Sequence, residues 1–546
     1  MKSKILITLI MGASLSFTAC DSYLDMTPTD SVSDKLVWSK VESAELAINN
    51  FYHYINYFGN FNSGQSTAGM TEGFTDIFKY GSMTYNAHMY IPNELAYGGS
   101  VLTVGYVSVY LGNWSDVYEY IRRVNEGLAN LNKYGSDISE TDAIRLAAEM
   151  RFFRGMLYSE LMKRYKEVII YDEDLTKIQK DTPLSSEATG WDFVEADLTF
   201  AGKNLPVNAK ANGRITSGAA YALLSRVMLY AERWDVAKNA ASEVFKMDYK
   251  LEDNFADAFT SNNKEAILQY SYDRAEVTHG FDNYFSPGGD QGNGMTGGYG
   301  TPTQEMVESF ELATGGYPDW SPWHTETGIS EEPPYADLEP RFHATILYNG
   351  ATWKGRTIES FIDGVDGWCS WKDDATPNGR TTTGYYLRKL VDETHDFNEH
   401  SSCVQPWIAI RLAEVYLNYA EACYQSGDAN GANTYIREIR KRVGLPYSDK
   451  SGESLMETIR QERKVELAYE GQYYWDMRRW KLADSAFTGL RVHGLKVEQN
   501  ANATFKYTYV DCDKQDRNFP SKMYRIPMPV AELNNNSTVE QYPEWR

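Results

Sequence analysis

Residues 411–443, RLAEVYLNYAEACYQSGDANGANTYIREIRKRV, contain two helical patterns separated by a turn. Apolar side chains recur with helical spacing on both sides of the Ser426-Gly427-Asp428 turn. They are Leu412, Val415, Tyr416 and Tyr419 before the turn, and Ala432, Tyr435, Ile436 and Ile439 after it. A small alanine just after the turn lets two antiparallel helices approach closely, as they do in tetratricopeptide pairs. The stretch therefore predicts a helical hairpin.

Two further stretches show a similar pattern. Residues 217–246 predict two helices with a break at Glu232-Arg233-Trp234, and residues 141–164 predict one long helix. Aligning Ala237 with Ala432 places the two hairpins 195 residues apart. Tandem repeats of this kind recur about every 34 residues. The sequence therefore predicts an all-α dominated fold in which a large insertion interrupts a scaffold of tetratricopeptide-like helix pairs.

The interrupting sequence is rich in loop-forming residues. Residues 280–400 hold 17 of the chain's 41 glycines and eight of its 18 prolines, and both residue types mark turns and loops. A second irregular segment, residues 51–114, is rich in Tyr, Gly, Ser and Asn. Because long loops on a rigid scaffold tend to carry function, we expect ligand contacts in these two segments.

The composition narrows the possible partners. The 546-residue chain has a formal charge of −22 and a pI near 4.9, which argues against nucleic acid as a partner. Aromatic residues make up 14% of the chain, more than a core of this size needs, so we expect some rings to face a ligand. Mean hydropathy is −0.50 and there is no internal apolar run long enough to predict a transmembrane helix.

The first twenty residues predict export and lipidation. Lys2 and Lys4 precede the apolar residues 5–13, and small residues then lead to Cys20. This pattern is typical of a bacterial lipoprotein signal, residues 1–19, after which Cys20 becomes the acylated N-terminus. The alternative is an ordinary signal peptide with an incidental cysteine. Several acyl chains on one cysteine would hold an otherwise soluble body at a membrane.

Five motifs follow one another along the chain: AAEMRFFRG at 147–155, GRITSGAA at 213–220, IRLAEVYLNYAEA at 410–422, the stretch 459–480 that includes YYWDMRRW, and RIPMP at 525–529. In this order they resemble the SusD/RagB family of outer-membrane lipoproteins. The resemblance implies a single domain, residues 20–546. Its helical scaffold would lie mainly in 34–60, 110–250 and 404–480, its ligand-loop insertion at about 270–403, and its tail in 510–546.

The family resemblance also implies a function. It implies a lipid-anchored protein on the surface of a Bacteroidetes-type cell, which captures glycans and delivers them to a SusC-type TonB-dependent transporter in the outer membrane. Peptide capture with the same kind of transporter, a secreted glycoside hydrolase and a purely structural lid are the alternatives.

A glycan-binding protein needs flat aromatic faces that stack on sugar rings, together with amides and carboxylates that bind hydroxyls. The candidate ligand-binding residues are Trp320, Trp323, Trp353, Trp368, Trp371, Tyr85, Asn86 and Tyr90. Possible polar partners near them are Asp319, Asn349, Asp363 and Asp366, and Tyr97 and Asn93 lie in the earlier segment. For any one of these tryptophans, a buried loop anchor is the alternative. We interpret Trp114, Trp475 and Trp480 as packing residues.

Motifs for catalysis, cofactors and metals are weak. Gly292-Asn293-Gly294-Met295-Thr296-Gly297 matches a dinucleotide-binding pattern, but the preceding residues do not form the hydrophobic strand that such a site needs. His395 and His400 are five residues apart and the sequence has no H-E-x-x-H motif. Residues 363–367 resemble a solvated turn more than a calcium loop. We therefore expect no enzyme activity, no cofactor and no metal.

Charged and sulfur-containing residues give two structural expectations. Arg460, Glu462, Arg463, Glu466, Glu470, Arg478 and Arg479 form a dense run, in which we expect some ion pairs to be buried against the scaffold. Cys369 and Cys403 lie in loop-like sequence and are a candidate disulfide pair, whereas Cys423 fits a small buried side chain.

Overall fold

The computed structural model describes residues 33–63, 69–81, 87–209, 213–291, 297–369 and 380–546. Helices dominate these residues, and the named strands form five separate two-stranded sheets. This confirms the predicted all-α dominated class. Residues 1–32, which include Cys20 and the predicted signal peptide, lie outside the described residues. No helix in the described ranges is long and apolar enough to cross a membrane.

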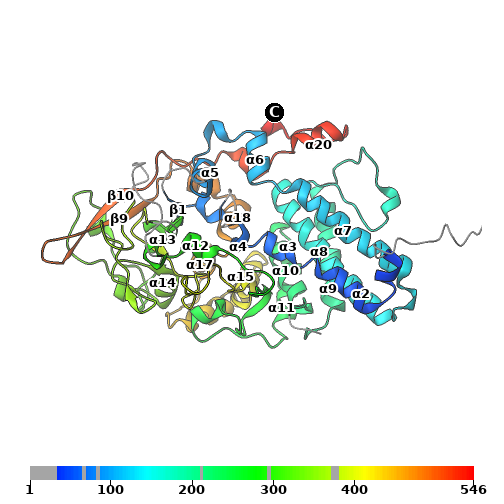
Figure 1. Cartoon of the computed structure of the whole chain (residues 1–546), viewed down its shortest axis with the longest axis horizontal. Coiled ribbons are helices and arrows are strands. Elements are labelled where there is room, and N and C mark those ends of the chain that lie inside the picture. The colour runs from blue at the N-terminus through cyan, green and yellow to red at the C-terminus, as the bar shows by residue number, and fades with distance from the viewer. Residues whose placement is uncertain (1–32, 64–68, 82–86, 210–212, 292–296, 370–379) are drawn as a thin grey trace, which may run out of the picture.

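An array of packed helices forms the scaffold, which extends from α7 to α11 on the right of Figure 1 to α15 and α17 in the middle of the molecule. Consecutive helices of the array pack on one another, and α11 packs on α15, so the array continues across the insertion. Its helices are α7 (Trp114–Tyr134), α8 (Glu140–Tyr165), α9 (Glu187–Asn204), α10 (Ser217–Tyr230), α11 (Trp234–Val244), α15 (Leu412–Gln425), α16 (Ala429–Arg442) and α17 (Glu453–Glu466). The predicted long helix and both predicted hairpins are therefore confirmed.

The α15–α16 turn shows how the sequence sets this packing. Gly427 has a φ of +80°, a conformation that glycine adopts without strain. Asp428 then caps α16 by accepting a hydrogen bond from the Gly431 amide. A Cβ on Gly431 would lie 2.8 Å from Cys423 Sγ, so the absence of a side chain lets the two helices meet. Cys423 and Ala432 are fully buried at this contact.

A short antiparallel ladder closes the insertion. Strand β2 (Ala266–Tyr270) precedes the insertion and pairs with β8 (Trp407–Arg411), which follows it. The Leu412 amide also donates to the Glu265 carbonyl at 2.9 Å. The chain therefore leaves and re-enters the helical array at one place, which is why the hairpins pack as neighbours despite their separation in sequence.

The insertion consists of loops and short elements. They are α12 (Phe281–Phe285), β3 (Gly300–Pro302), α13 (Gln304–Val307), α14 (Pro340–Thr345), β4 (Ile346–Leu347), β5 (Thr352–Trp353), β6 (Arg356–Thr357) and β7 (Tyr386–Leu387). The hairpin of β9 (His493–Gln499) and β10 (Phe505–Asp511) packs against it and projects from the side opposite the array (Figure 1).

The remaining elements come from the N-terminal segment and the C-terminal segment. They are α1 (Asp34–Trp38), α2 (Val41–Asn49), α3 (His53–Tyr57), α4 (Asn60–Ser63), β1 (Phe78–Tyr80), α5 (Ala87–Tyr97), α6 (Val104–Tyr110), α18 (Tyr473–Arg479), α19 (Ala483–Phe487) and α20 (Val530–Asn535).

Buried ion pairs connect the helices to the insertion. Arg411 is fully buried and binds Glu265 at 2.6 Å, Glu466 at 2.7 Å and Glu470 at 2.7 Å. Burial alone would raise the pKa of Glu466, but the guanidinium groups of Arg442, Arg411 and Arg341 hold that pKa well below its usual range. The expectation that part of the charge run is buried and structural is confirmed.

Candidate functional site

The two aromatic-rich irregular segments are joined by a β-ladder. Strand β1 belongs to the earlier segment and pairs antiparallel with β3 of the insertion, with Phe78 opposite Pro302 and Tyr80 opposite Gly300. Both strands are completely buried. Segments more than 200 residues apart in sequence are thus held in one rigid unit.

Just beyond this ladder, three stretches of chain meet at what we call the loop junction: Gly81, Gly298, Tyr299, Arg380 and Thr382. The Gly81 amide donates to the Tyr299 carbonyl at 2.8 Å. A Cβ on Gly298 would lie 3.1 Å from the backbone nitrogen of Arg380, and one on Gly81 would lie 3.8 Å from Thr382. Gly298 has a φ of +60°, so glycine suits both its conformation and the close contact.

Several predicted ligand-binding residues border the loop junction in sequence. Tyr85, Asn86 and Trp371 lie outside the described residues. Tyr90, on helix α5, is 42% exposed. Trp368 is half-buried against the small apolar cluster of Val492 and Cys512.

Polar contacts fix α5 beside the loop junction. The buried Asn93 side chain donates to the carbonyls of Tyr80 and Gly81, at 3.4 Å each, and accepts from Lys79 Nζ at 2.7 Å. Tyr97 is also buried and lies within 3.4 Å of Asp513. Asn93 and Tyr97 therefore position the helix, and Tyr90 is its exposed aromatic side chain.

The other three predicted tryptophans are buried anchors of the insertion. Trp353 is fully buried and its indole N–H donates to Asp290 Oδ2 at 2.7 Å. Trp323 donates to the Glu331 carbonyl at 3.0 Å, and Trp320 packs edge-on against it with ring centroids 5.9 Å apart. In this structure the alternative interpretation, a buried loop anchor, fits these three rings.

The acidic residues expected near the tryptophans are part of the same internal packing. Asp366 is fully buried, and its carboxylate binds Arg356 at 2.6 Å and 2.8 Å. Arg356 also binds Asp290 at 2.6 Å, so it links the carboxylate that holds Trp353 to Asp366. We expected a solvated turn at residues 363–367. This expectation is wrong at Asp366, because Arg356, 10 residues away, balances the charge of the Asp366 carboxylate and permits its burial.

The suggested disulfide is also wrong. Cys403 carries a free thiol, so it does not pair with Cys369. Trp114 and Trp475 are buried, as expected for packing residues, but Trp480 is only half-buried and lines a cavity.

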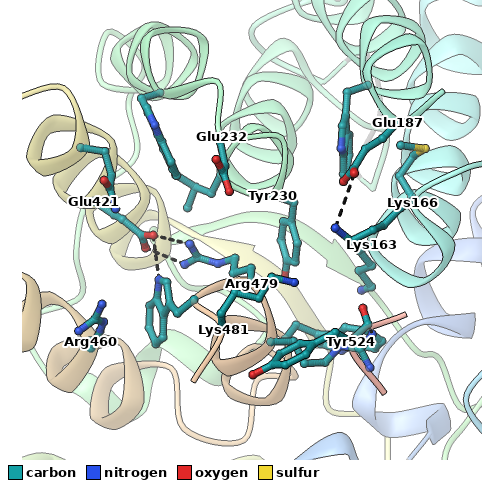
Figure 2. A pocket seen from close by; sticks show the side chains of 18 residues that line it. Lys163, Lys166, Glu187, Tyr230, Glu232, Glu421, Arg460, Arg479, Lys481 and Tyr524 are labelled. Atoms are coloured by element: carbon teal, nitrogen blue, oxygen red, sulfur yellow. Dashed lines mark hydrogen bonds and ion pairs between the residues drawn. The ribbon is translucent and has the colours of Figure 1, made fainter. Parts of the chain in front are cut away.

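Figure 2 shows this cavity, of about 350 Å³, between the array and α18. Its basic lining residues are Lys163, Lys166, Arg460, Arg478, Arg479 and Lys481, and its acidic ones are Glu187, Glu232 and Glu421. Arg479 and the Trp480 indole both bind Glu421, the latter at 2.9 Å (Figure 2).

The charged side chains that line this cavity are therefore mainly basic, although the protein as a whole is acidic. Burial lowers the pKa of Lys163 to about 8, and Lys163 remains bound to Glu160 at 2.7 Å. Sequence reasoning missed this cavity because its lining comes from seven helices, whose side chains converge only in the folded chain.

A second cavity, of about 750 Å³, lies between the insertion and helices α16 and α17. Tyr317 lines it and is 53% exposed, and Tyr447 lies on the other side. Its polar groups include Glu311 and Arg440, which bind each other at 2.7 Å. This cavity offers an aromatic face and polar partners at a distance from β1 and β3.

Known proteins resemble most of the chain. A sequence model of the SusD family matches residues 264–545, and a model described as starch-binding and associating with the outer membrane matches residues 23–229. A SusD-like protein from Bacteroides ovatus is 26% identical over 503 residues, which cover 88% of this chain and 83% of the relative.

Solved structures share the fold. A SusD-like protein from Bacteroides fragilis superimposes with a TM-score of 0.76 at 28% identity, over 95% of this chain and 99% of that one. A laminarin-binding SusD-like protein superimposes with a TM-score of 0.60 at 22% identity, over 92% and 99%. The family model that covers residues 264–545, more than half of the chain, shows that this protein belongs to the SusD family.

Proposed function

We propose that this protein is a cell-surface, lipid-anchored glycan-binding protein without catalytic activity. The observation that carries the proposal is the loop junction, where the two aromatic-rich segments meet beside helix α5, which carries the exposed ring of Tyr90. The starch-binding description of the matching family model and the laminarin-binding structural neighbour support it.

Glycan binding at the loop junction needs no proton transfer. A pyranose ring presents C–H groups to an aromatic face, and its hydroxyls bind amides, carboxylates or backbone groups. The buried anchors Trp320, Trp323 and Trp353 keep the insertion rigid, which reduces the entropy lost when a ligand binds. We assign the ligand contacts to Tyr90 and Trp368, with Tyr85, Asn86 and Trp371 in the adjoining sequence.

We further propose that the captured glycan is delivered to a SusC-type TonB-dependent transporter in the outer membrane. Lipidation at Cys20 would keep the protein at that membrane, and no cofactor or nucleic acid is involved. Purification of the tagged, lipidated protein from outer membranes should recover such a transporter in a fixed ratio. Failure to recover a transporter would contradict the proposed delivery step and leave the proposal of glycan binding unaffected.

Native gels that contain individual polysaccharides test the binding site. Wild type should be retarded by one class of glycan, and Tyr90→Ala should lose most of that retardation. Tyr317→Ala is the matched control, because it removes another exposed tyrosine, from the second cavity. If Tyr317→Ala abolishes binding and Tyr90→Ala does not, the site lies at the second cavity instead.

Three additional measurements address the alternatives. Release of reducing ends from the retarding glycan would favour a glycoside hydrolase over a binder. Retardation by no polysaccharide, together with binding of oligopeptides in a calorimetric titration, would favour peptide capture. Transport that persists without any measurable affinity for glycan or peptide would favour a structural lid.

A further inference from the structure

Three potential metal ligands gather where the two ends of the insertion meet. Asp282 lies on α12, while His395 and Cys403 lie near the end of the insertion. One ligand atom from each of these side chains lies within 4.8 Å of the other two, and all three residues are buried. Backbone hydrogen bonds of 3.0 Å and 2.8 Å between His279 and Cys403 hold the two chain segments together at this point.

The orientation of His395 suits a metal ligand. Its Nε2 lies 2.9 Å from the backbone carbonyl of His400, and its Nδ1 lies 2.9 Å from Asp282 Oδ2. If Nε2–H donates to that carbonyl, Nδ1 presents its lone pair toward the Asp282 carboxylate. Metal-binding histidines usually have this arrangement, in which the outer nitrogen donates to a carbonyl or carboxylate.

Cys403 and Asp282 complete the donor set. The Gln405 amide donates to Cys403 Sγ at 3.4 Å, a contact that favours a thiolate. Oδ1 of Asp282 is buried and makes no hydrogen bond within the described part of the chain, although a buried carboxylate oxygen normally has a partner. Asp392 Oδ2 lies 3.8 Å from Cys403 Sγ, on the half-buried side of the cluster.

His279, a buried histidine that also lies near the cluster, is not a ligand. Its Nε2 lies 3.0 Å from the Gln405 carbonyl, and its Nδ1 accepts from the Phe281 amide at 3.3 Å. Both ring nitrogens are therefore occupied by the backbone, and the ring stacks on Phe61.

We propose that Asp282, His395 and Cys403 bind a structural zinc ion, with Asp392 as the fourth ligand. A thiolate, an imidazole and carboxylates are ligands that zinc accepts in a tetrahedral site, whereas calcium and magnesium prefer oxygen alone. The divalent ion would balance the buried Asp282 carboxylate and Cys403 thiolate, and the single negative charge left by Asp392 would lie on the half-buried side of the cluster. Zinc bond lengths of about 2.0–2.3 Å place the donor atoms of a tetrahedral site about 3.5 Å from one another, so donor atoms that now lie up to 4.8 Å apart need to approach one another.

The ion would join positions that are 113 residues apart in sequence. Linking such distant positions restricts the unfolded chain, and a metal that binds only the folded state stabilises it by mass action. The spacing of these residues matches no zinc motif in the sequence, and for that reason the sequence predicted no metal. The zinc would hold the two ends of the insertion together and would take no part in catalysis.

Metal content and affinity test the proposal on the full mature chain. Purified protein should be stripped with a chelator, kept reduced and titrated with Zn²⁺ alone, with bound metal measured by plasma mass spectrometry. Wild type should bind one zinc per chain, and Cys403→Ser should lose at least about tenfold in affinity. Cys423→Ser is the matched control, because it removes another buried thiol from the α15–α16 contact, and it should retain the wild-type affinity.

A spectroscopic measurement covers the case in which Cys403→Ser fails to fold. Co²⁺ added to the stripped wild type should produce a thiolate-to-cobalt charge-transfer band, and Zn²⁺ should displace it. If wild type and Cys403→Ser bind zinc equally, the proposal is overturned, because the zinc site would then lie elsewhere on the chain. Absence of both the band and a zinc-dependent rise in Tm of the wild type would also overturn it and leave a metal-free Asp282–His395 ion pair.

Discussion

Arg411 in the helical scaffold and Arg356 in the insertion both bind buried carboxylates, but in different surroundings. Arg411 is fully buried and binds three glutamates, Glu265 before the insertion and Glu466 and Glu470 at the end of α17 and just after it. Arg356 has 30% of its side chain exposed and binds Asp290 and Asp366, which belong to the same insertion.

The comparison shows how one kind of interaction serves two purposes. The Arg411 group joins α15, α17 and the strand entering the insertion, so it connects elements that fold as a unit. The Arg356 group fixes one loop to another beside Trp353. We therefore expect the loss of Arg411 to affect the whole protein and the loss of Arg356 to affect mainly the insertion.

Arg411→Met should have the largest effect. It leaves Glu265, Glu466 and Glu470 buried without their shared partner, and breaking a buried ion pair costs about 3–5 kcal/mol. The free energy of unfolding, measured in urea, should fall by about that amount. Arg437→Met is the control, because its pair with Asp449 is exposed, and it should change stability by less than about 1 kcal/mol. Similar values for both variants would contradict the structural role of Arg411.

Arg356→Met should have a smaller and more local effect. Asp366 keeps hydrogen bonds from the Gly289 and Glu359 amides, so we expect a loss of about 2 kcal/mol. Amide hydrogen exchange should accelerate around residues 356–367 and remain unchanged in α15 and α16. Faster exchange throughout the array would show that the insertion and the scaffold unfold together.

Stability at alkaline pH should depend on Lys389. Burial lowers its pKa to about 8, with a further contribution from Arg411 and an opposing one from Glu470. Between pH 8 and 10.5 the unfolded state retains a proton on this lysine that the folded state has lost, so the free energy of unfolding rises with pH. Wild type should gain on the order of 2 kcal/mol relative to Lys389→Met across this range. A constant difference would mean that Lys389 stays charged beside Glu470.

Tyr90→Ala should have the smallest effect on stability. The ring is 42% exposed, and substitutions at such surface positions usually change stability by less than about 0.5 kcal/mol. Thermal unfolding should therefore match wild type although glycan retardation is lost. A large decrease in Tm would show that the ring is a packing residue, and the loss of binding would then not locate the site.

The scaffold could be predicted further than the site. The spacing of Leu412, Val415 and Ala432 predicted the α15–α16 hairpin because helical periodicity is local. The charge run predicted buried ion pairs. It did not predict that Arg411 also binds Glu265, which lies 146 residues from that arginine. For each tryptophan the sequence left two interpretations open. A tryptophan that anchors a loop and one that stacks on a sugar are the same residue type, and they have similar neighbours in the sequence.

The sequence by itself determined the helical class, the interruption of the array, the two aromatic-rich segments and the resemblance to the SusD family. These features depend on local periodicity, composition and ordered motifs. Only the tertiary structure decided that Trp353 is buried while Tyr90 is exposed, that Gly81 meets Tyr299, and that Asp282 lies beside His395. Burial and proximity of this kind depend on contacts between residues far apart in sequence, and local patterns do not encode those contacts.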